Sequence, residues 1–193
     1  MTAANLPKIY VFDFDRTITH IHTGGCAVTP EEVGEEYIRS NIKDGFVELV
    51  EYLVQRGDRI YIATYGDDRF SRGIKGATAG HALIKRYMDV VFGADQRYFF
   101  FASPKDPQGN IIARCTNDGK YYHLELILVQ EALDGGDPDI MRGILLIDDD
   151  PYNVHYFASR GCMTLVPDSP YDSAHLAAAA GVLRTLLNQL RDG

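Results

Sequence analysis

Carboxylate side chains are concentrated directly after two apolar runs that are too short to be helices. The run over residues 8–12 is followed by Asp13 and Asp15, and the run over residues 143–147 is followed by three acids at 148–150. Each pattern predicts a buried strand with acids at its tip. Carboxylates brought together repel one another, and a folded protein tolerates them mainly when a hard cation lies among them. Oxygen ligands suit Mg²⁺, which commonly works with phosphate-bearing substrates, so these acids predict magnesium-dependent chemistry on a phosphate.

The elements that must position these acids alternate between strands and helices along the whole chain. Such alternation predicts an α/β, Rossmann-like fold, with a parallel sheet, helices on both faces and right-handed crossovers. With 193 residues and 46% hydrophobic composition, the chain can bury a full core, and we expect one domain over residues 1–193. The predicted strands cover residues 8–12, 59–63, 89–92, 98–101, 111–115, 143–147 and 162–166. The predicted helices cover residues 30–41, 44–55, 67–88 (as one helix or two), 120–133, 152–159 and 173–190.

Several polar residues fall where predicted strands end. Asp13 and Asp15 follow the first strand, Thr64 follows the strand over residues 59–63, and Asp148 follows the strand over residues 143–147. In open parallel sheets, ligands bind at the carboxyl ends of the strands. We therefore expect these side chains to form one site.

The order of these residues resembles that of a known family. Asp13-x-Asp15-x-Thr17, Thr64 after the second strand, Lys120 at a helix start and Asp148-Asp149 after a later strand are similar to the four motifs of the haloacid dehalogenase (HAD) superfamily. The resemblance covers residues 8–166. Each motif alone is weakly specific, but four in order, each on the expected type of element, are specific.

The resemblance implies a role for each of these residues. Asp13 would be the nucleophile that forms an aspartyl-phosphate. Asp15 would be the general acid and base, and its backbone carbonyl would reach the metal. Thr64 would hydrogen-bond the transferring phosphoryl group, and Lys120 would neutralise charge on the nucleophile and the phosphoryl oxygens.

The metal ligands follow from the same resemblance. It implies Mg²⁺ held by Asp13, Asp15, Asp148 and Asp149, with Asp149 binding the ion or orienting its waters. Asn153 fits an Asp-Asp-x-x-x-Asn spacing of some phosphatase branches and would support the ligands from behind.

For some of these residues, a purely structural role is the alternative. Thr64 alone could be a turn residue and Lys120 alone a surface residue. Lys105, in a predicted turn over residues 104–110, is the rival to Lys120. Asp150 precedes Pro151 and is expected to cap a helix rather than bind metal.

The segment after the first strand is predicted to cover the site only in part. Residues 17–29 alternate in polarity and then reach Gly24 and Gly25, a pattern that predicts a small hairpin flap. His20 and His22 would share one face of it, as metal ligands, substrate contacts or plain surface. The intervals 19–43 and 93–119 are too short to fold as a cap domain, so we expect the open site of an uncapped HAD branch.

Charge and composition limit the partners. The chain has 19 basic and 27 acidic residues, a net charge of −8, which argues against duplex DNA and anionic membranes as partners. Residues 69–120 carry nine basic and four acidic side chains, either a face for an acidic substrate or a solvated surface. Three cysteines without a pairing pattern and the lack of a membrane-length apolar segment predict a soluble, reduced, cytoplasmic protein.

Together these features predict hydrolysis of a phosphomonoester, with a phosphoprotein (including phosphotyrosine) or a small sugar or nucleotide phosphate as substrate. The basic stretch and the aromatic residues 98–101 favour a macromolecular substrate. Two other classes stay open: a phosphate-binding protein without catalysis, and a receiver domain that is phosphorylated on an aspartate. Asp15 argues against a receiver, because it supplies the acid and base that turnover needs.

Overall fold

A parallel sheet forms the centre of the molecule. The computed structural model describes residues 6–93, 109–167 and 181–192, and in these residues it contains a five-stranded sheet in the order β3-β2-β1-β4-β5. Every neighbouring pair of strands is parallel. The strands are β1 Ile9–Phe12, β2 Arg59–Thr64, β3 Ile111–Ala113, β4 Ile144–Ile147 and β5 Met163–Leu165. The predicted α/β, Rossmann-like fold class is confirmed.

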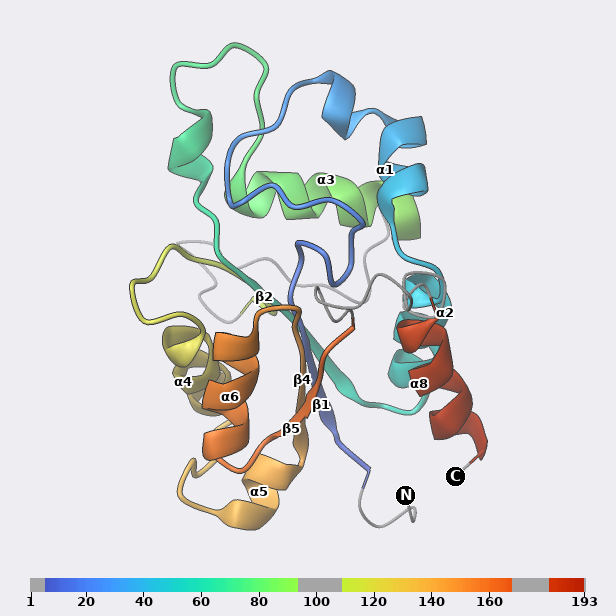
Figure 1. Ribbon diagram of the computed structural model, residues 1–193, viewed down its shortest axis with the longest axis vertical. Helices are drawn as coiled ribbons and strands as arrows, with labels where there is room; N and C mark the ends of the chain where they lie inside the picture. The colour runs from blue at the N-terminus through green and yellow to red at the C-terminus, as the bar shows by residue number, and fades with distance from the viewer. Residues whose placement is uncertain (1–5, 94–108, 168–180, 193) are drawn as a thin grey trace.

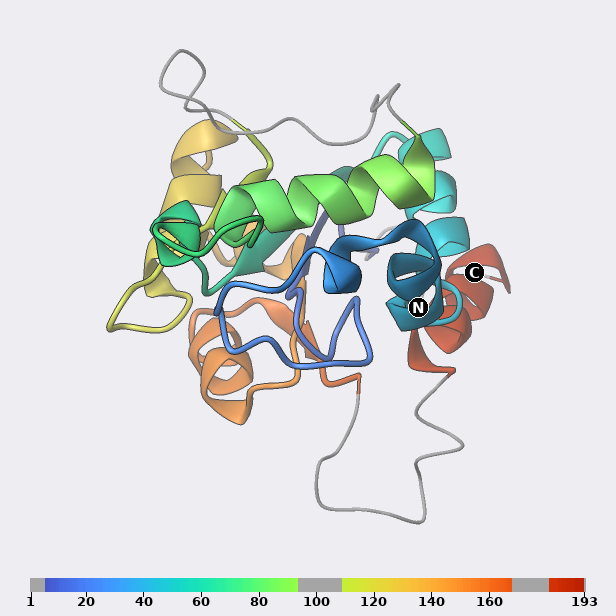
Figure 2. The same ribbon diagram turned by 90° about the horizontal axis from the view of Figure 1, so that it is seen from above.

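Helices cover both faces of this sheet (Figure 1). One face packs against α2 Phe46–Gln55, α3 Gly80–Phe92 and α8 Val182–Asp192, and the other against α4 Tyr121–Gln130, α5 Pro138–Arg142 and α6 Pro151–Ser159. Seen from above, α3 crosses the molecule over the ends of the strands (Figure 2). The short helices η2 Glu31–Val33, α1 Glu35–Asn41 and η3 Asp68–Ser71 lie in the connections.

The strand that precedes Asp13, β1, is buried on both sides. Tyr10 and Phe12 pack in the cluster that includes α2, whereas Ile9 and Val11 pack in the cluster that includes α4. Burial of such a side chain contributes roughly 1.5–3 kcal/mol. A run that is apolar at every position therefore forms a central strand and holds its tip in a fixed place.

One predicted strand is absent, and one predicted helix is divided in two. Residues 89–92 are not a strand but the last turn of α3, because Val90 continues the buried stripe of Leu83 and Tyr87 at helical spacing. The helix predicted over residues 30–41 is broken at Gly34, which has extended backbone (ψ 146°) between η2 and α1. The N-terminal half is thus a separate 3₁₀ turn.

The predicted hairpin over residues 17–29 does not form. Its residues pair with distant segments instead of with each other: Thr19 bridges to Ile42, and Val28 bridges to Thr78, both antiparallel. Residues 17–29 are an ordered loop, and its middle part lies at the carboxyl ends of the strands.

Some predictions lie outside the described residues. These are the strand over residues 98–101, Lys105 with most of its turn, and the first part of the helix predicted over residues 173–190; the described part of that helix is α8. In the part of the chain that the structure describes, no helix is both long enough and apolar enough to span a bilayer.

Candidate active site

Strand register brings the predicted residues together. Phe12 pairs with Ile147, so Asp13 and Asp148 are the next residues on neighbouring strands. The backbone ladder continues past the strands, because Asp13 N donates to the Ile147 carbonyl at 2.9 Å and Asp148 N donates to the Leu165 carbonyl at 3.1 Å. These bonds fix the backbone of both acids.

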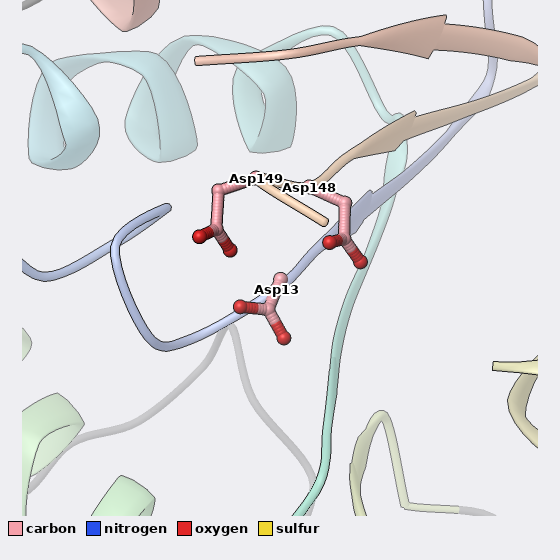
Figure 3. A group of neighbouring side chains, drawn as sticks. All are labelled: Asp13, Asp148 and Asp149. Atoms are coloured by element: carbon pink, nitrogen blue, oxygen red, sulfur yellow. The ribbon is translucent and has the colours of Figure 1, made fainter. Parts of the chain in front are cut away.

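Three carboxylates converge at this edge of the sheet. Oxygens of Asp13, Asp148 and Asp149 lie within 4.8 Å of one another. Figure 3 shows the three side chains grouped beyond the ends of β1 and β4. Asp13 and Asp148 are buried, and Asp149 is partly buried. Three of the four predicted metal ligands therefore share one small space.

Lys120 provides the positive charge inside this group. Its ammonium nitrogen lies 2.6 Å from Asp13 Oδ1 and 2.7 Å from Asp148 Oδ2, and the residue is only 4% exposed. Burial disfavours the ammonium, but Asp13 and Asp148 outweigh burial and raise the pKa of Lys120. Lys120 is thus a buried cation, and the alternative that it is only a surface residue is wrong.

The donor set fits a divalent cation that prefers oxygen. When all four groups are ionised, three carboxylates face one ammonium, an excess of two negative charges. Burial raises the pKa of Asp13 to about 7 with Asp148 adding to the effect, although Lys120 opposes it. Burial and Asp148 likewise raise the pKa of Asp149. A hard cation with two positive charges would offset this excess, and carboxylate oxygens are the ligands that Mg²⁺ prefers.

The Asp15 carboxylate is not among the three converging acids, and its hydrogen bonds go to the loop over residues 17–29. Its Oδ2 accepts hydrogen bonds at 2.9 Å from the backbone N–H groups of Thr23 and Gly24, and it lies 3.1 Å from His22 Nδ1. The Thr23 hydroxyl reaches both oxygens, at 3.0 Å for Oδ1 and 2.9 Å for Oδ2. Oδ1 therefore has one partner, a hydroxyl that can rotate, whereas Oδ2 is fixed by the loop.

Thr64 and His123 also line the site. Thr64 ends β2 and is buried, and its carbonyl oxygen lies 3.2 Å from His123 Nε2. His123 is 1% exposed, and its Nδ1 has no hydrogen-bond partner among the described residues. Burial, reinforced by the charge on Lys120, lowers the pKa of His123 to about 4. The neutral ring donates from Nε2 and ties the end of β2 to the first turn of α4.

Asn153 connects Lys120 to Asp148. Its Nδ2 donates to both Asp148 oxygens, at 3.4 and 3.2 Å, and its Oδ1 accepts from the Lys120 backbone N–H at 3.2 Å. Gly119 makes this approach possible, because a Cβ there would lie 2.8 Å from Asn153 Oδ1 at a φ of +56°. These contacts agree with the prediction that Asn153 supports the metal ligands.

A pocket of about 320 Å³ opens over these groups, a size within the range of small-ligand sites. It contains all of the predicted site residues. Its described lining is Asp13, Asp15, His22, Gly24, Gly25, Thr64, Tyr65, Gly119, Lys120, His123, Asp148, Asp149, Asp150 and Asn153.

Asp150 has a structural role, and His20 lies outside the pocket. Asp150 caps α6 by accepting from Tyr152 N at 2.9 Å, as predicted. His20 is exposed and is not among the residues that line the pocket. Sequence reasoning missed His123; the available signal was its place three residues after Lys120, which puts both on one face of a helix.

Comparison with known proteins finds matches among solved structures alone: no family model and no curated protein matches the chain. One match is DsGPDH of Dunaliella salina, with 13% identity, a TM-score of 0.46, and 79% of this chain and 22% of that one covered. Another is the N-terminal part of protein BF1531 of Bacteroides fragilis, which contains a phosphatase domain complexed with Mg. It matches with 14% identity and a TM-score of 0.49, and the match covers 95% of this chain and 40% of that chain. A predicted HAD-like family hydrolase of Porphyromonas gingivalis matches with 12% identity and a TM-score of 0.48, and the match covers 93% of this chain and 98% of that chain.

The chain thus spans less than half the length of the first two of these proteins. The likeness is one of fold alone.

Proposed function

We propose that the protein is a HAD-type phosphatase that hydrolyses phosphomonoesters through an aspartyl-phosphate on Asp13, with Mg²⁺ as cofactor. The observation that supports this most is the buried ammonium of Lys120, 2.6 Å from Asp13 and 2.7 Å from Asp148, beside the third acid Asp149. An ammonium among three carboxylates is costly to bury and is suited to receive a doubly charged phosphoryl group.

In the first step, a carboxylate oxygen of Asp13 attacks phosphorus and the bond from phosphorus to the ester oxygen breaks. Asp15 gives its proton to the departing oxygen. The Thr64 hydroxyl donates to the phosphoryl oxygens, and Lys120 neutralises the charge that they and Asp13 share. The products of this step are an alcohol or phenol and the acyl-phosphate.

In the second step, Asp15 takes a proton from water, and the resulting hydroxide attacks the phosphorus of the acyl-phosphate. The bond between phosphorus and the Asp13 oxygen breaks, which regenerates the Asp13 carboxylate and releases inorganic phosphate. Asp15 Oδ1 is the oxygen suited to exchange this proton, because Oδ2 already accepts from two backbone N–H groups. The Thr23 hydroxyl at 3.0 Å can rotate to accept from a protonated Oδ1.

Asp13, Asp148 and Asp149 would hold Mg²⁺ by their carboxylates, and Asp15 by its backbone carbonyl. When bound, the ion supplies charge neutralisation to the phosphoryl group. Asn153 orients Asp148 from behind through its amide group.

The test is hydrolysis of phenyl phosphate with Mg²⁺ and with excess chelator. We expect activity that requires the metal, loss of activity in Asp13→Asn, and a fall of about 10²–10⁴-fold in Asp15→Asn. Asp139→Asn is a matched control, because this acid is exposed on α5. Full activity in Asp13→Asn would exclude the covalent route. A stable acyl-phosphate without turnover in the unmodified protein would favour a receiver-like switch instead.

A further inference from the structure

Tyr65 stands beside the position where the phosphoryl group would be transferred. It directly follows Thr64 at the end of β2, it lines the pocket, and it is 52% exposed. A substrate whose phosphate reaches Thr64 would therefore place its next atoms near this ring.

The ring of Tyr65 is held against the loop after β1. A Cβ at Gly25 would lie 2.7 Å from Tyr65 Cδ1 and 2.8 Å from the Tyr65 carbonyl oxygen, and Gly25 has a φ of +72°. Only glycine fits so close a contact at that backbone angle. A tyrosine phenol is neutral near pH 7 at its ordinary pKa, and a hydrogen bond with Cys115 raises the pKa of Tyr65 further. Tyr65 and Gly25 thus form one uncharged wall of the pocket.

The rest of the described lining differs in chemistry from this wall. Apart from glycines, its side chains are carboxylates, an ammonium, imidazoles, a hydroxyl and an amide, all suited to phosphate, metal or protons. Among the described lining residues, Tyr65 alone offers a large apolar face. The group that the phosphate esterifies would have this one surface for van der Waals contact.

We propose that Tyr65 determines specificity by stacking on an aromatic group, so that the preferred substrates are aryl phosphate monoesters, of which phosphotyrosine is the form found in proteins. This inference rests on the proposed phosphatase function. Aromatic rings pair by offset stacking or edge to face, whereas a saturated ring gains only area burial. The flat ring of an aryl ester can satisfy that geometry beside Thr64.

The test compares hydrolysis of phenyl phosphate and cyclohexyl phosphate, because these esters are similar in size and differ in aromaticity. Aryl esters react faster for intrinsic reasons, so the informative quantity is the change in kcat/KM caused by substituting Tyr65. We expect Tyr65→Leu to lower kcat/KM for phenyl phosphate by about threefold to tenfold, with a change below about twofold for cyclohexyl phosphate. Tyr65→Phe should keep the preference, and Phe70→Leu, an exposed aromatic outside the pocket, should change neither value. Equal losses for both esters, or no loss for either, would overturn the inference.

Binding of the non-hydrolysable phenylphosphonate and cyclohexylphosphonate separates this inference from the proposed function. Calorimetry in the presence of Mg²⁺ should show tighter binding of phenylphosphonate, and Tyr65→Leu should remove that difference. If the difference is present without hydrolysis of any ester, the inference stands and the phosphatase function fails. Equal binding of the two phosphonates by the unmodified protein would overturn the inference even if both esters are hydrolysed.

Discussion

The stability of this protein should depend on pH through the buried ring of His123. Burial lowers the pKa of His123 from 6.5 to about 4 in the folded state, whereas the unfolded chain keeps the ordinary value. The unfolded state therefore binds a proton on this ring between pH 6.5 and 4 while the folded state does not. The stability that the neutral ring contributes is complete above pH 6.5 and is lost as the pH falls toward 4. The difference of 2.5 pKa units corresponds to about 3 kcal/mol over that window.

Other groups titrate in the same range, so the assay must isolate His123. Burial raises the pKa of Asp13 to about 7, which changes stability in the opposite direction. We therefore compare the unmodified protein with His123→Gln, whose amide can still donate to the Thr64 carbonyl, by urea unfolding at pH 7 and pH 4.5. The unmodified protein should lose about 2–3 kcal/mol more than the variant between these pH values.

The control for this comparison is His20→Gln, because the ring of His20 is exposed. This variant should follow the unmodified protein at both pH values. Identical pH dependence of the unmodified protein and His123→Gln would refute the reasoning, because a buried neutral ring must cost free energy to protonate. A histidine resonance that titrates near pH 6.5 and disappears in His123→Gln would refute it as well.

Three further substitutions test the contacts around the acids. Replacing Lys120 with Met should lower kcat/KM for phenyl phosphate at least about 10²-fold in steady-state assays, and unchanged activity would contradict its role at the phosphoryl group. Gly119→Ala should cost about 1–3 kcal/mol more in urea unfolding than Gly57→Ala, because both have positive φ but only Gly119 has close neighbours; equal costs would contradict this packing argument. Asn153→Ala should raise the Mg²⁺ concentration for half-maximal activity about 10–100-fold, and an unchanged titration would show that the amide does not support Asp148.

The edge of the sheet at which the acids gather could be predicted because it depends on strand type. Apolar residues at every position of β1 and β4 identify central parallel strands, and parallel strands end at one edge of the sheet. The residues that follow them, Asp13 and Asp148, therefore share that edge, and the observed strand order makes them neighbours. The same reasoning gives Thr64 at the end of β2. The place of Lys120 came instead from the resemblance to the HAD superfamily.

The loops and the ends of helices could not be predicted in this way. The alternation over residues 17–29 is typical of a hairpin, but Thr19 and Val28 instead pair with segments more than twenty residues away. Val90 has a high strand propensity, yet the buried face of α3 decides its conformation. The bonds from residues 22–24 to Asp15 and the contact between Tyr65 and Gly25 depend on that loop, so they required the structure.

The proposed mechanism requires a phosphoryl group on Asp13 during turnover, and one measurement tests this directly. Asp15→Asn is mixed with 4-nitrophenyl phosphate and Mg²⁺, quenched in acid within the first turnovers, and digested for peptide mass spectrometry. 4-Nitrophenolate departs without protonation, so the first step does not need the acid that this variant lacks. Because the variant also lacks the base that activates water, we expect the intermediate to accumulate, with one phosphoryl group on the peptide that contains Asp13 and none when Mg²⁺ is removed. Release of 4-nitrophenolate with no phosphorylated peptide, or a phosphoryl group on another residue, would contradict this mechanism.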